Sequence, residues 1–150
     1  MKNFNRLFTI LQLLLLTNSI FCNAQKNETP ATPLNESFKI AFGSCAHQDK
    51  EQPMLQKAVK LNPDLFIYLG DNIYGDTRDM NVLKNKYEKL ASKTEFQELK
   101  KSTTILSVWD DHDFGENDKG RHYPFKKESK EIFMNFWEVP QDSERRTHEG

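Results

Sequence analysis

The sequence has no strong excess of charge of one sign, no internal repeat and no low-complexity domain. Its 150 residues include 21 Lys and Arg against 22 Asp and Glu, which gives a formal net charge of −1. Domains that bind nucleic acids depend on basic surfaces that neutralise phosphates, so this balance excludes nucleic acid as an expected partner. The length suits a single domain.

Long apolar runs are also scarce. The main one, Leu7 to Phe21, is interrupted by polar residues and is too short for a stable membrane span. It follows a positively charged start and precedes small residues that end at Ala24, which is the pattern of a secretory signal peptide. A retained membrane anchor and lipidation at Cys22 are the alternatives, although the bulky Phe21 is unsuited to lipoprotein cleavage.

These features divide the chain into three parts. Residues 1–24 are expected to be a signal peptide, residues 25–36 a flexible leader rich in Pro, Thr and Asn, and residues 37–150 the folded domain. The protein is therefore expected to be exported, either to the periplasm or out of the cell. Cleavage after Ala24 leaves Cys45 as the last cysteine, so it is either a small buried apolar residue or a chemically active thiol.

Apolar periodicity predicts strands that alternate with helices. Alternating or continuous apolar runs predict strands over residues 37–42, 64–69 and 104–109. Helical spacing predicts helices over residues 52–61, 80–91 and 126–137, with a short further helix starting at Thr94. This order is typical of parallel βαβ units and of the α/β class. The strand over residues 64–69 is uninterruptedly apolar, so we expect it to be buried on both faces.

Polar residues follow each predicted strand. Cys45 follows the first, Asp71 and Tyr74 follow the second, and Asp111 and His112 follow the third. Ligands of parallel sheets bind outside the carboxyl ends of the strands, where these turns would meet. The sequence therefore predicts a functional site at that edge.

The third turn, Trp109 to Asp118, holds four Asp, one Glu, one His and one Asn in ten residues. Such a turn is ordinarily solvated, but these acids follow a predicted buried strand. Buried like charges repel unless a proton or cation neutralises them, and a metal ion is the simplest neutraliser. His112 is either a structural residue between acids or a proton donor.

The side chains in the three turns suit two kinds of cation. A thiolate on Cys45 selects a transition metal, and a phenolate on Tyr74 suits ferric iron. Carboxylate and amide oxygens suit a hard cation such as calcium. Asp71 is a candidate ligand of both cations.

Three sequence motifs carry a resemblance to a known family. Phe42-Gly43-Ser44-Cys45, the segment Gly70 to Asp76 and the segment Trp109 to Asp113 resemble motifs of the alkaline phosphatase D-like (PhoD-like) metallophosphatases. The later segment Phe136 to Pro140 and the Arg145-Arg146 pair are similar to that family too.

The resemblance implies an exported phosphoesterase that hydrolyses phosphomonoesters or phosphodiesters with an Fe³⁺ and Ca²⁺ centre. Its fold would be part of a metallophosphatase-type sandwich with a parallel βαβ core. By motif position Cys45 and Tyr74 would ligate iron, Asp71 would bridge, Asp111 would hold calcium and Asn117 would add an oxygen. His112 would be the catalytic residue, either as an acid or as a group that stabilises the transition state. The implied mechanism is two-metal hydrolysis of a small-molecule phosphoester.

The family continues beyond the equivalent of Gly150 with more sheet and further His and Asp ligands. We therefore expect this chain to be the amino-terminal portion of the domain, incomplete and with a half-built metal site; whether it is active alone is a question for metal analysis. Two other classes stay open: a non-catalytic exported calcium-binding module that uses the acidic turn, and a thiol-based reactive protein built on Cys45.

Overall fold

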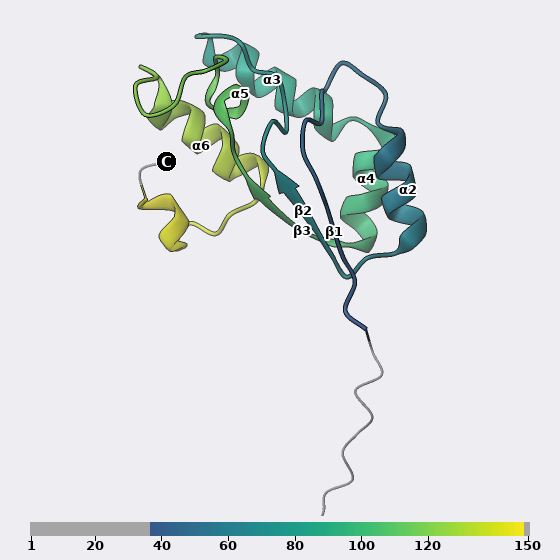
Figure 1. Ribbon diagram of the computed structural model, residues 1–150. Helices are drawn as coiled ribbons and strands as arrows, with labels where there is room; N and C mark the ends of the chain where they lie inside the picture. Colours follow the sequence, from purple (N-terminus) through teal and green to yellow (C-terminus); the bar gives the residue numbers. More distant parts are fainter. Residues whose placement is uncertain (1–36, 149–150) are drawn as a thin grey trace, which may run out of the picture. The chain divides into compact units, whose positions relative to one another are not determined.

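The computed structural model describes residues 37–148, which form a three-stranded parallel sheet and its helices (Figure 1). The strands are β1 (Ile40–Gly43), β2 (Leu65–Leu69) and β3 (Thr104–Val108), paired in the order β1-β2-β3. The predicted α/β class with a parallel βαβ core is confirmed at this level. The predicted signal peptide and leader lie outside the described residues.

The helices follow the predicted order with small shifts at their ends. They are α2 (Pro53–Leu61), α3 (Met80–Ala91), α4 (Thr94–Ser102), α5 (Asp111–Phe114), α6 (Lys126–Phe136) and the 3₁₀ helix η1 (Glu144–Arg146). α5 and η1 were not predicted. Within residues 37–148, no helix is long and apolar enough to cross a membrane.

One face of the sheet carries the core. Phe66 and Tyr68 of β2 are buried on this face and pair with Ile105 and Ser107 of β3. The ring of Tyr68 lies 4.9 Å from that of Trp137, which follows α6, and 6.2 Å from that of Phe96 of α4. Right-handed crossovers through strands in sequential order place the connecting helices on the same face, which agrees with this burial pattern.

The opposite face of the sheet is apolar and open. Its middle row is Phe42, Ile67 and Leu106, paired across the three strands, and Phe42 is 69% and Leu106 49% exposed. Leu69 and Val108 form an exposed row beside it. The prediction that the second strand is buried on both faces is therefore wrong in this structure. The apolar run of β2 does have two apolar faces, but the helices of residues 37–148 cover only one of them.

We expect polar substitutions on the open face to leave stability unchanged and to reduce surface hydrophobicity. The double variant F42T/L106T introduces β-branched side chains, which strands favour, so its free energy of unfolding should change by less than about 0.5 kcal/mol. Binding of a hydrophobic dye such as anilinonaphthalene sulfonate should fall. As a control, Leu99→Ala at a fully buried site should cost about 2–5 kcal/mol. A loss of similar size in the double variant would mean that this face is buried.

Candidate metal centre

The turns after the three strands meet at the carboxyl edge of the sheet. The backbone N–H of Cys45, after β1, donates to the carbonyl of Gly70, after β2, at 3.2 Å. The Sγ of Cys45 then lies 3.6 Å from Oδ2 of Asp71. The first turn is thus held against the second, and its thiol lies beside a carboxylate.

The second turn is held against the third at Gly75. Its N–H donates to the carbonyl of His112 at 3.1 Å. A Cβ at this position would lie 2.5 Å from that carbonyl oxygen and 2.7 Å from Cδ1 of Leu83. Only glycine permits this approach, which brings Tyr74 and Asp76 next to His112.

The acidic core of the site is formed by Asp71, Asp111 and His112. One possible ligand atom from each of them lies within 4.8 Å of the others. Oδ1 of Asp71 is buried and receives no hydrogen bond from any described residue. Burial raises the pKa of Asp71, and the neighbouring charges of Asp110 and Asp111 raise it further. A buried carboxylate oxygen without a donor is costly, so the site favours an added proton or cation.

Tyr74 contacts two imidazole rings at the same edge. Its ring stacks on His47 with centroids 4.5 Å apart and approaches His112 at 4.3 Å. Burial and a hydrogen bond with the Cys45 side chain raise the pKa of Tyr74 to about 12. The phenol is therefore protonated at neutral pH. It would serve as an iron ligand only after the charge of the metal had lowered its pKa and the proton had left.

Asp76 positions His112, a role that the sequence analysis missed. Its Oδ1 lies 2.8 Å from Nδ1 of the His112 ring and accepts the backbone N–H of Asn117 at 3.2 Å. A carboxylate only accepts, so Nδ1 carries the proton and Nε2 is the ring nitrogen available for a cation or substrate. The motif Gly75-Asp76 close to Tyr74 was the available signal.

The remaining predicted residues are placed as follows. Asn117 is exposed, and its side-chain amide donates to Asp118 at 2.8 Å, so only its backbone joins the cluster through Asp76. The backbone N–H of His112 donates to Oδ1 of Asp111 at 2.9 Å, and the N–H of Asp118 donates to Oδ2 of Asp111.

The acids of the third turn differ sharply in burial. Asp110 is exposed and caps α5 in a reciprocal capping box with Asp113, whereas Asp113 is fully buried. The carboxylate of Asp113 is satisfied by hydrogen bonds from Asn72, Tyr87 and the backbone of Asp110. The expectation that the acids are buried as a group is therefore correct only for Asp113.

Backbone strain is concentrated in this region. Cys45, Asp71 and Asp76 all have positive φ angles, 59°, 51° and 43°, in the left-handed region that non-glycine residues avoid. Each such conformation costs on the order of 1–3 kcal/mol and persists where the surrounding structure enforces it. Such strain is typical of functional sites, where the direction of a side chain is held at a cost in backbone energy.

The residues fit the cations that the sequence resemblance implies. The fit rests on the unpartnered buried Oδ1 of Asp71 and on the donor set near it: the thiol of Cys45, the phenol of Tyr74 and the oxygens of Asp111. A cation at Asp71 would neutralise the repulsion between Asp71 and Asp111. Soft and phenolic donors suit iron, and carboxylates suit calcium.

Comparisons of the chain with models of protein families, with curated proteins and with solved structures give no match.

We expect Gly75→Ala to destabilise the protein because its Cβ would meet the backbone of His112. The free energy of unfolding should fall by about 1–3 kcal/mol, and the His112 loop should shift. Gly120→Ala is the matched control, because a Cβ at Gly120 meets nothing within 4 Å. Chemical denaturation of both variants is the measurement, and equal stability would contradict the close contact between the two turns.

Proposed function

We propose that this chain carries the metal centre of an exported phosphoester hydrolase of the PhoD-like type. The observation that carries the proposal is the cluster at the carboxyl edge, where side-chain atoms of Asp71, Asp111 and His112 lie within 4.8 Å of one another and Cys45 adjoins Asp71. Substrates are small phosphomonoesters or phosphodiesters.

The proposed roles divide the centre into two halves. Cys45 and Tyr74 would hold Fe³⁺, Asp71 would serve both cations, and Asp111 would hold Ca²⁺. Asn117 has no part in the calcium site, because its exposed side-chain amide is bonded to Asp118. When bound, the cations polarise the phosphoryl oxygens and lower the pKa of the attacking water. Asp71 and Asp111 supply the negative charge that retains the cations beside an anionic substrate.

His112 acts on the leaving oxygen in this proposal. Water adds to phosphorus and releases a proton to solvent, and the bond between phosphorus and the leaving oxygen breaks. That oxygen takes a proton from Nε2 of His112 in the imidazolium form, which carries a proton on both ring nitrogens and is restored from solvent. Asp76 holds the ring through Nδ1 at 2.8 Å, so that Nε2 faces the reacting group. A phosphomonoester gives an alcohol and inorganic phosphate, and a phosphodiester gives an alcohol and a phosphomonoester.

Metal content tests the first half of this proposal. After dialysis, elemental analysis of the purified chain should find about one iron per chain, with calcium retained. Asp71→Asn should weaken cation binding by at least about 100-fold, because Asp71 is a proposed direct ligand and loss of even an outer-shell partner costs up to about 100-fold. Asp142→Asn removes the same charge at an exposed position and should have no effect. Calcium without iron, and without hydrolysis, would favour the calcium-binding module instead.

Kinetics test the role of His112. His112→Ala should lower kcat for a chromogenic phosphomonoester by roughly 10²–10⁴-fold and leave the metal content unchanged, because the main ligands remain. His122→Ala, at an exposed position, is the control. Loss of metal in His112→Ala would show that this residue is a ligand rather than the proton donor.

A further inference from the structure

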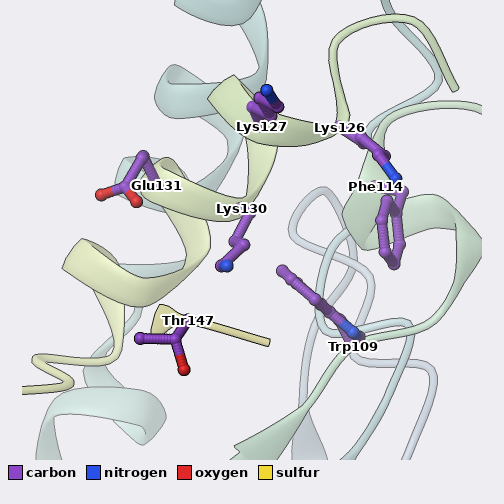
Figure 2. A pocket seen from close by; sticks show the side chains of 7 residues that line it. All are labelled: Trp109, Phe114, Lys126, Lys127, Lys130, Glu131 and Thr147. Atoms are coloured by element: carbon purple, nitrogen blue, oxygen red, sulfur yellow. The ribbon is translucent and has the colours of Figure 1, made fainter. Parts of the chain in front are cut away.

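A second pocket lies between α6 and the third turn (Figure 2). Its volume is about 300 Å³, which is large enough for a small ionic group and part of an organic chain. Aromatic rings of the third turn form one side of the pocket, and charged side chains of α6 form the other. Thr147, near the carboxyl end of the described chain, adds a hydroxyl. The lining residues are Trp109, Phe114, Lys126, Lys127, Lys130, Glu131 and Thr147.

The pocket carries net positive charge. Glu131, its one acid, is 3.0 Å from Nη1 of Arg146, so its charge is already compensated. Nζ of Lys130 donates to the carbonyls of Arg146 and His148 at 2.5 and 2.6 Å, and carbonyl groups do not cancel its charge. Nζ of Lys127 has no partner among residues 37–148. Ammonium groups that line a pocket attract anions. Water weakens this attraction more at the exposed Lys127 than at the half-buried Lys130.

This pocket adjoins the candidate metal centre. Trp109 and Phe114, whose ring centroids lie 4.6 Å apart, also line a neighbouring hollow of about 540 Å³. That hollow is lined as well by Asp110, Asp111 and Asp118. One aromatic wall therefore separates a basic pocket from the acidic turn that contributes Asp111 to the centre.

We infer that the basic pocket binds a second anionic group of the substrate, carried on the part that leaves after hydrolysis. The inference rests on the proposed function and narrows the substrate class to phosphoesters with a further phosphate or carboxylate. The reacting phosphate lies at the acidic edge, where cations are required to hold it. The second anion lies against Lys127 and Lys130, where the protein supplies the positive charge itself.

Binding of inorganic phosphate to metal-free protein tests the pocket without any reaction. After chelator treatment the acidic edge repels anions, so phosphate should shift the indole N–H resonance of Trp109 and leave that of Trp137 in place. Lys127→Gln should weaken this binding by about threefold to tenfold. Lys60→Gln removes the same charge on α2, away from the pocket, and should match the wild type. An unmoved Trp109 resonance, or equal affinity in Lys127→Gln, would overturn the inference.

Hydrolysis of three matched substrates tests the specificity. In the metal-loaded protein, hexane-1,6-diol bisphosphate and 6-(phosphonooxy)hexanoate should each exceed hexyl phosphate in kcat/KM by about tenfold, an advantage that Lys127→Gln removes. A higher value for only one of them identifies the second anion as phosphate or carboxylate. Equal values for all three would refute the inference. Hydrolysis of none would refute the proposed function, and the Trp109 titration would still decide the pocket.

Discussion

The buried carboxylate of Asp113 is the contact on which the arrangement of the site depends. It accepts the backbone N–H and the side-chain amide of Asn72 at 3.2 and 3.1 Å, the hydroxyl of Tyr87 at 2.8 Å and the N–H of Asp110 at 3.1 Å. These donors come from the turn after β2, from α3 and from the start of α5. Burial raises the pKa of Asp113 to about 6, although the hydrogen bonds from Asp110, Tyr87 and Asn72 counteract this. A single acid thus ties together three segments that the sheet alone would not fix.

This arrangement separates two uses of acidic residues within one short turn. Asp113 points inward and its charge is spread over four donors, so it is part of the fold. Asp71 and Asp111 lie at the edge, where Asp71 keeps a buried oxygen without a donor. Among the described residues, four hydrogen-bond donors thus reach Asp113 and none reaches Oδ1 of Asp71. The uncompensated negative charge is that of Asp71 and Asp111 at the edge of the sheet, where an added cation would be stabilised.

Sheet topology explains both the position of the site and the open apolar face. Strands in sequential order, joined by helical crossovers, bring the turns after β1, β2 and β3 to one edge. The same order gathers the helices on the face that holds Phe66 and Tyr68. Phe42 and Leu106 on the other face are left exposed among the described residues. The position of the candidate metal centre and the uncovered face thus have one common cause.

The sequence by itself determined the elements, because apolar periodicity and turn residues act over a few neighbours. It predicted α3 to the residue, the order of strands and helices, and the edge at which Cys45, Asp71, Tyr74, Asp111 and His112 would gather. What it could not determine were contacts between distant residues. The pairing of Asp76 with His112, the burial of Asp113 and the basic pocket beside Trp109 join positions up to 41 residues apart. Only tertiary packing decides which side chain of an acidic turn is buried, because burial depends on donors such as Tyr87 supplied from elsewhere in the chain.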